Sequence, residues 1–160
     1  PAINWLTSYS LYNRSLESWY TENAGDQWND SIATAMSVLT EESKLQEIVQ
    51  LVGSDALPED QQLTLEVARM LREFYLQQNA FHDVDTYCTT QNQSKFLSVI
   101  LHYKDLAEKA MSSGVELEKV IGLPILEDIG RAKFEENMVE LLDKYDKTMA
   151  NDFAKLMEEA

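Results

Sequence analysis

Apolar residues recur every three or four positions along most of the chain, a spacing that is typical of amphipathic helices. The first two stripes predict a short helix over residues 11 to about 23 and a long helix over residues 28–52. In the long helix the stripe shifts phase between Leu39 and Leu45. This helix therefore either contacts two neighbouring helices or kinks near Thr40.

The middle of the chain predicts two more helices with an ordered loop between them. Pro58 suits the first position of a helix, because a missing N–H costs nothing there. The apolar stripe of this helix is Leu63, Val67, Met70, Leu71 and Phe74. The period is lost over residues 76–88, which we expect to form an ordered loop. Thr90 and Gln93 have the spacing of a capping box, which predicts the start of the next helix, ended by Gly114.

Three further helices complete the pattern. A short one ends at Gly122, another runs from Pro124 to about Ala132, and the last carries the stripe Met138, Leu142, Tyr145, Met149, Phe153 and Leu156. No alternating pattern typical of a strand occurs beyond residue 10. We therefore predict an all-α fold, a bundle of six to seven mostly antiparallel helices over residues 11–160. A short extended segment, residues 1–10, precedes it.

Charge and composition narrow the classes of function. The chain has 160 residues and a net charge of −15. Nucleic acid backbones bind lysine and arginine, so we expect no nucleic-acid partner. No apolar run approaches the roughly 20 residues that cross a bilayer, so we expect no membrane insertion. The turn at residues 53–61 carries Asp55, Glu59 and Asp60, and it is either a solubilising surface or a face that meets a basic partner.

Motifs that carry phosphate or metal chemistry are missing or weak. The phosphate-loop pattern G-x-x-x-x-G-K-[ST] does not occur, and we assign no catalytic residue to this chain. The side chains of His82, Asp83, Asp85 and Cys88 are types that ligate metals, but their spacing matches no established zinc pattern. We expect a hydrogen-bonded loop and no metal at this segment.

The segment QQNAF, residues 77–81, combines side-chain amides with an aromatic ring. Amides such as those of Gln78 and Asn79 can bond the edge of a nucleotide base, while a ring such as that of Phe81 can stack on its face. The composition of the segment fits a plain loop as well, so the residues alone leave both readings open.

Three stretches of the sequence resemble one family. Residues 42–88, the start PAINWLTSYSLY and the later ILEDIGRAKF resemble the C-terminal region of the catalytic A-type polypeptide of archaeal-type and vacuolar-type rotary ATPases. The resemblance implies a helical domain, with residues 1–10 as the linker that leaves a nucleotide-binding domain upstream. It also implies that the phosphate loop lies outside this chain. We therefore expect the chain alone to be inactive and to bind no cofactor, while the parent enzyme binds ATP or ADP with Mg²⁺.

The resemblance implies two sites. The loop at Gln78, Asn79, Ala80 and Phe81 lies against the adenine of the bound nucleotide in this family. The acidic turn contacts the rotating central stalk and transmits torque to it, and its residues here are Asp55, Ala56, Leu57, Pro58, Glu59, Asp60 and Gln61.

The resemblance also implies partners and a location. The partners are non-catalytic B-type subunits, the central stalk and the chain's own upstream nucleotide-binding domain. The assembly is a peripheral complex at the cytoplasmic face of the cell membrane that couples ATP synthesis or hydrolysis to proton or sodium transport. The alternative is a free-standing helical adaptor that binds a partner helix and no nucleotide.

Overall fold

The computed structural model describes residues 3–160; Pro1 and Ala2 lie outside the described residues. The predicted all-α fold is confirmed, and residues 3–160 contain no strand. The α-helices are α1 (Glu17–Ala24), α2 (Trp28–Val52), α3 (Glu59–Met70), α4 (Thr90–Ser112), α5 (Leu117–Ile121), α6 (Ile125–Arg131) and α7 (Met138–Glu158). Shorter elements are the 3-10 turns η1 (Ser54–Ala56), η3 (Asp85–Tyr87) and η4 (Ala132–Phe134) and a π-helix, η2 (Leu71–Leu76).

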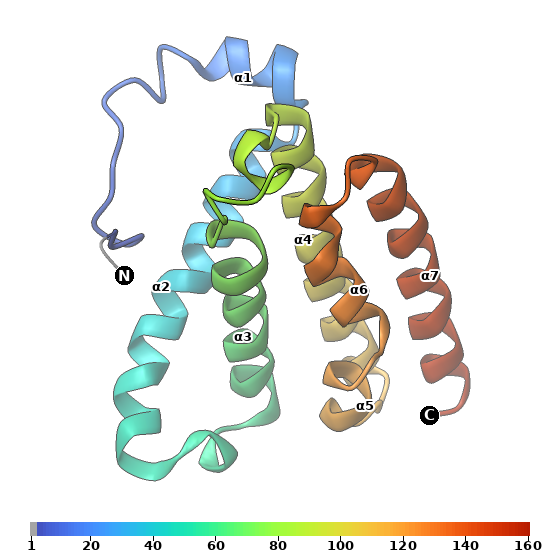
Figure 1. The fold of residues 1–160 in the computed structure, drawn as a ribbon. Coiled ribbons are helices and arrows are strands. Elements are labelled where there is room, and N and C mark those ends of the chain that lie inside the picture. The colour runs from blue at the N-terminus through green and yellow to red at the C-terminus, as the bar shows by residue number, and fades with distance from the viewer. Residues whose placement is uncertain (1–2) are drawn as a thin grey trace.

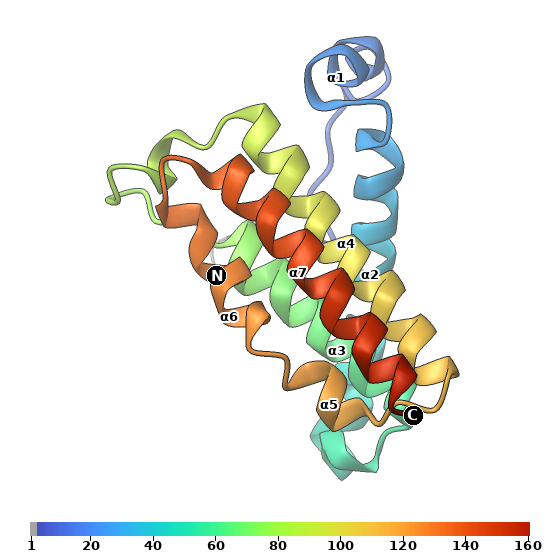
Figure 2. The same ribbon diagram turned by 90° about the vertical axis from the view of Figure 1, so that its right-hand side faces the viewer.

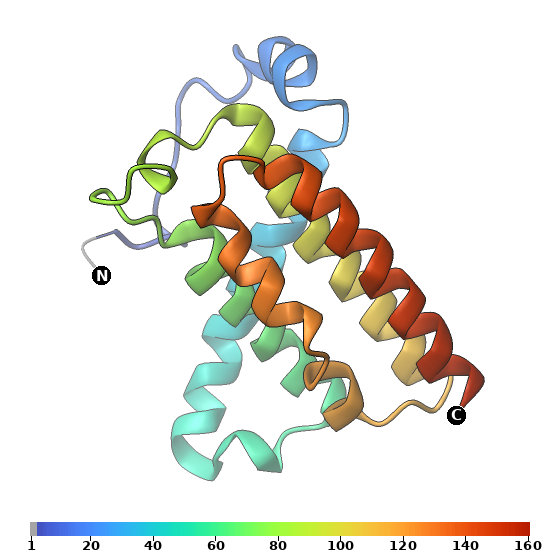
Figure 3. The same ribbon diagram turned by 45° about the vertical axis from the view of Figure 1, so that its right-hand side comes forward.

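Most helices that follow one another in the chain run antiparallel, as predicted. α2 and α3 form a hairpin, α4 returns beside α3, and α6 and α7 form a second hairpin (Figure 1). The most extensive helix pair, α4 with α7, is parallel instead, because α5 and α6 carry the chain back to the end of the bundle at which α4 starts (Figure 3). The bundle thus has two ends, with α1 at one and the η1 turn at the other.

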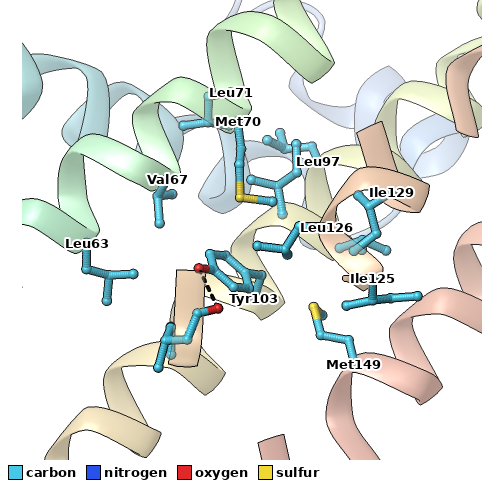
Figure 4. Close-up of a cluster of buried hydrophobic side chains, with 14 of the residues drawn as sticks. Leu63, Val67, Met70, Leu71, Leu97, Tyr103, Ile125, Leu126, Ile129 and Met149 are labelled. Atoms are coloured by element: carbon cyan, nitrogen blue, oxygen red, sulfur yellow. Dashed lines mark hydrogen bonds between the residues drawn. The ribbon is translucent and has the colours of Figure 1, made fainter. Parts of the chain in front are cut away.

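The core lies between α3, α4, α6 and α7, and Tyr103 of α4 is at its centre (Figure 4). The Tyr103 ring is fully buried, and its hydroxyl donates to the carbonyl of Val120 at 3.5 Å. The methionines Met70 and Met149 are fully buried beside it, as expected of side chains that fill a core. Burying one such apolar side chain contributes about 1.5–3 kcal/mol, so this shared core holds the helices in one arrangement.

The first helix is shorter than predicted. α1 begins at Glu17, whereas residues 11–16 form turns in which Ser10 Oγ accepts from the Tyr12 amide at 3.1 Å. No residue of α1 is buried. A short helix depends on the packing of an apolar face, which this one lacks, so the helical spacing over residues 11–16 is misleading. The domain boundary at residue 10 stays a prediction.

The long helix α2 is uninterrupted, so the kink that is one of the two alternatives near Thr40 does not occur. The helix contacts α1, α3 and α4, which fits the other alternative, that of several neighbours. Beyond Leu45 the apolar stripe leaves the bundle, because Ile48 and Val52 are both exposed.

Two helix starts differ from prediction by one residue. The helix after the acidic turn begins at Glu59, and Pro58 precedes it in extended conformation while its carbonyl accepts the first helical N–H groups. The cap of α4 is Thr89, not Thr90, because the Thr89 hydroxyl accepts from the Asn92 amide at 3.2 Å. Among residues 3–160, no helix combines the length and apolar character that crossing a membrane requires.

Candidate functional site

The candidate site begins where α3 changes its hydrogen-bond pattern. In the π-helix η2 the amide of Gln77 donates to the carbonyl of Arg72, five residues back, at 3.0 Å. An α-helix would pair that amide with the carbonyl of Glu73 instead, so the wider turn leaves this carbonyl free for another donor. Single π turns are frequent at functional sites.

The loop that follows, residues 77–89, is closed by the buried carboxylate of Asp85. This side chain is 2% exposed, and its Oδ2 accepts from the amide of Asn79 at 2.6 Å. The Thr86 hydroxyl donates to the carbonyl of Asn79 at 3.2 Å, so both polar groups of that residue's backbone are bonded. The ring of His82 also serves the loop, since its Nδ1 accepts from the amides of Val84 and Asp85. The loop is therefore ordered by its own side chains, as predicted.

Phe81 projects from this ordered loop and is 97% exposed. Its amide is fixed by a 3.0 Å hydrogen bond to Asn79 Oδ1, which occupies the oxygen of that side-chain amide. Gln78, Asn79 and Ala80 are exposed beside it. The structure thus brings the four predicted residues together on one surface, and an aromatic face with a neighbouring amide is available to a flat ligand or to another protein surface.

An open depression of about 980 Å³ lies next to the loop, between its amide residues and the α6–η4 region. Phe81 is not part of its lining. On its floor, Lys133 of η4 donates from Nζ to the carbonyls of Gln77 at 2.7 Å and Glu73 at 3.1 Å. Burial lowers the pKa of Lys133, and the nearby Asp85 carboxylate opposes that shift. Lys133 thus binds the carbonyl that the π turn leaves free.

The HDVDTYC segment is a hydrogen-bonded loop, as predicted. Its groups are used internally or are unreactive: the ring of His82 packs against Phe134 at a centroid distance of 4.7 Å, and Cys88 is half-buried. Burial raises the pKa of the Cys88 thiol, Asp85 raises it further, and a hydrogen bond from Gln78 acts in the opposite direction. Within residues 3–160 no three His, Cys, Asp or Glu side chains are grouped so that they could hold a metal ion.

The acidic turn between α2 and α3 forms the second predicted site. Asp55, Glu59 and Asp60 are exposed, and no cationic side chain of residues 3–160 lies within 4 Å of their carboxylates. Leu57 differs from the rest, because its side chain is only 7% exposed. Its carbonyl accepts from the Gln62 side chain at 2.8 Å. Leu57 therefore fixes the turn to the bundle rather than offering its side chain to a partner.

The remaining residues of the turn are exposed or partly exposed. Ala56 and Pro58 are exposed and Gln61 is half-buried. The exposed apolar end of α2 continues this surface through Leu51 and Val52. The turn therefore presents both apolar and acidic groups to solvent.

One continuous helical segment joins the two sites. Residues 59–76, α3 followed by η2, begin at the acidic turn and end at the loop of Phe81. At 1.5 Å per residue in its α-helical part, this segment is roughly 25 Å long. Figure 2 shows the two sites at opposite ends of the bundle. A displacement at one end can therefore reach the other through a rigid element.

Sequence reasoning misses the residues that hold the loop. In the sequence Asp85 stands out only as a possible metal ligand, and Lys133 only as part of ILEDIGRAKF. The π turn is not foreseen either. No residue pattern reveals an amide that bonds five residues back, and Lys133 is far from the loop in the sequence. The resemblance of residues 125–134 to a family is the one signal that points to this region.

Comparison with known proteins gives a consistent result. Residues 17–121 match the family model described as the C-terminal domain of V and A type ATP synthase. The chain is 49% identical to the A subunit of the A-type ATP synthase of Methanopyrus kandleri, over 100% of the chain and 27% of that protein. It is 49% identical to the A 1 subunit of the A-type ATP synthase of Methanospirillum hungatei JF-1, over 100% of the chain and 28% of that protein.

A third relative gives the same picture. The A subunit of the A-type ATP synthase of Pyrococcus horikoshii is 49% identical over 92% of the chain and 15% of that protein. The chain thus spans about a quarter, or less, of the length of the curated relatives it matches. The chain belongs to the family of C-terminal domains of V- and A-type ATP synthases.

Proposed function

We propose that the chain is the C-terminal helical domain of the catalytic subunit of a rotary ATP synthase, an enzyme that synthesises or hydrolyses ATP. In this proposal Gln78, Asn79, Ala80 and Phe81 form one wall of the adenine pocket. The acidic turn contacts the central stalk. The observation that carries the proposal is the almost complete exposure of Phe81 on a loop that a buried carboxylate holds in place, in a chain of this family.

The loop's share in nucleotide binding follows from its chemistry. An exposed apolar ring costs free energy in water, and a stacked base removes it from water at a gain of about 1–3 kcal/mol. Asn79 Oδ1 is already bonded to the Phe81 amide, so only its N–H₂ group is left to bond the base. We assign the phosphates and Mg²⁺ to the nucleotide-binding domain of the parent polypeptide, because the sequence here has no phosphate loop.

The acidic turn acts as a mechanical contact in this account. Nucleotide binding at one end of the bundle moves the domain, and residues 59–76 transmit the movement to the turn at the other end. Exposed carboxylates interact weakly in water, so the shape of the turn contributes more than its charge. The partners are non-catalytic B-type subunits, the central stalk and the parent's nucleotide-binding domain, in a peripheral complex at the cytoplasmic membrane face that transports protons or sodium ions.

A free-standing adaptor is the competing function. It would use the exposed Phe81 and the apolar end of α2 to bind a partner helix and would bind no nucleotide. The family match and the share of the relatives' length favour the catalytic polypeptide over the adaptor.

The experiment that tests the proposal compares two exposed aromatic residues of the same region. In the full-length polypeptide within its complete enzyme, Phe81→Ala should weaken ATP binding by about 1–3 kcal/mol. Tyr87→Ala, which also removes an exposed ring, should leave ATP binding unchanged. Neither variant should change the melting temperature, because neither ring is buried. Equal ATP affinity in wild type and Phe81→Ala would remove Phe81 from the site.

A further inference from the structure

We propose that Lys133 and Asp85 are positioning residues for the adenine-binding loop, setting nucleotide affinity and base selectivity without touching the nucleotide. The inference rests on the proposed function of that loop. It assigns a role to the η4 segment, which lies outside the two sites described above.

The first observation is the way in which the π turn and Lys133 fit each other. Because the Gln77 amide bonds to Arg72, the carbonyl of Glu73 has lost its α-helical donor. Lys133 Nζ donates to this carbonyl at 3.1 Å and to that of Gln77 at 2.7 Å. One ammonium group thus bonds the last turn of the helix and the first residue of the loop, fixing the direction in which the loop leaves the helix.

The second observation is the bond on the other side of Gln78. Asp85 Oδ2 accepts from the Asn79 amide at 2.6 Å, and the carboxylate is 2% exposed. The backbone is therefore held at Gln77 by a cation and at Asn79 by an anion, one residue either side of Gln78. The next two residues, Ala80 and Phe81, are exposed and depend on these two bonds for their orientation.

Charge makes both bonds stronger than ordinary loop hydrogen bonds. Bonds from an ammonium group or to a carboxylate are roughly twice as strong as bonds between neutral groups. Lys133 is partly buried and Asp85 almost completely, so water competes poorly for either. Removing one charge also leaves the other without its nearby opposite charge in a partly buried place.

The test uses the full-length polypeptide in its complete enzyme. Lys133→Met keeps the length of the side chain and removes the donor, and Lys133→Arg keeps a donor. Lys155→Met is the matched control, because Lys155 is an exposed lysine that pairs only with Asp152 at 3.4 Å. Dissociation constants are measured for ATP and for GTP, together with the turnover rate at saturating ATP. Hydrogen exchange of the peptide spanning residues 77–89 reports on the loop itself.

Lys133→Met should raise the dissociation constant for ATP by about 3–30-fold, part of the effect of losing the stacked ring. The preference for ATP over GTP should fall, the peptide should exchange faster, and the rate at saturating ATP should change little. Lys133→Arg should restore most of the affinity and preference. Asp85→Asn, which keeps an acceptor oxygen, should have a smaller effect than Asp85→Ala.

Two results would contradict the inference in different ways. If Phe81→Ala weakens ATP binding while Lys133→Met and Asp85→Ala leave affinity and base preference unchanged, the positioning role is wrong and the adenine site stands. If Phe81→Ala also has no effect, the proposed function fails and the positioning role fails with it. A melting temperature that falls in Lys133→Met with unchanged base preference would show a purely structural lysine.

Discussion

Gly130 of α6 lies directly against the ring of Phe74 in the π turn. A β-carbon added to Gly130 would be 2.9 Å from Phe74 Cε1, closer than such atoms approach in proteins. The glycine therefore allows α6 to approach the helical segment that carries the loop. This contact lies three residues before the Lys133 bond, so α6 and η4 together support the start of the loop.

Replacing this glycine should destabilise the chain. Gly130→Ala should lower the free energy of unfolding by about 1–3 kcal/mol, because the ring of Phe74 must move, even though alanine favours a helix by about 1 kcal/mol. Urea unfolding measures the change. The double variant Gly130→Ala with Phe74→Leu is the control: a smaller side chain at position 74 should make the two changes non-additive, and simple additivity would argue against the contact.

The ion pair between Glu42 and Arg72 should contribute measurably to stability. Glu42 is 7% exposed and accepts from Arg72 through both Nε, at 3.1 Å, and Nη2, at 2.9 Å, which joins α2 to the π turn. Glu42→Gln should cost about 1–3 kcal/mol, less than a fully buried pair because Arg72 is partly exposed. The matched control is Glu41→Gln, which removes an exposed pair with Lys44 and should cost less than about 1 kcal/mol. Equal costs would contradict the account.

Stability should fall above pH 10 because of Tyr75. Burial, and secondarily the charge of Cys88, raise the pKa of Tyr75 to about 12. An unfolded tyrosine titrates near pH 10, so between pH 10 and 12 the native state binds more protons than the unfolded chain. The free energy of unfolding should then decrease with pH, by up to about 1.4 kcal/mol per pH unit for this group. Tyr75→Phe should flatten the slope in urea titrations, and an unchanged slope would show that Tyr75 titrates normally.

The sequence predicts those parts of the fold that depend on local spacing. The limits of α2 at Trp28 and Gly53 and the apolar stripe of α7 follow from residues three or four positions apart, whose packing decides whether they form a helix. The predicted start of α1 is wrong because the same spacing occurs at residues 11–16 without any surface to pack against. The predicted helix starts at Pro58 and Thr90 are wrong by one residue, since several neighbouring residues could serve as caps.

The candidate site can be predicted only in part. The residues that face solvent, such as Phe81, are found from composition and family resemblance. The residues that hold them are not, because Lys133 reaches the loop through tertiary packing over 56 residues of sequence. The burial of Leu57 within an otherwise exposed turn also depends on the surrounding bundle and not on the turn itself.

The central claim is that the α2–α3 turn transmits movement by its shape, and rotation of the complete enzyme tests it most directly. Alanine at Asp55, Glu59 and Asp60 together should leave the domain folded and rotating, with torque modestly changed, because exposed charges contribute little. Removal of residues 56–58 withdraws the turn and the buried Leu57 that fixes it. This variant should still hydrolyse ATP while losing its coupling to rotation. Single-molecule rotation and ATPase rates are recorded side by side for both variants. The claim is contradicted if the triple alanine variant stops rotating while the shortened variant rotates normally.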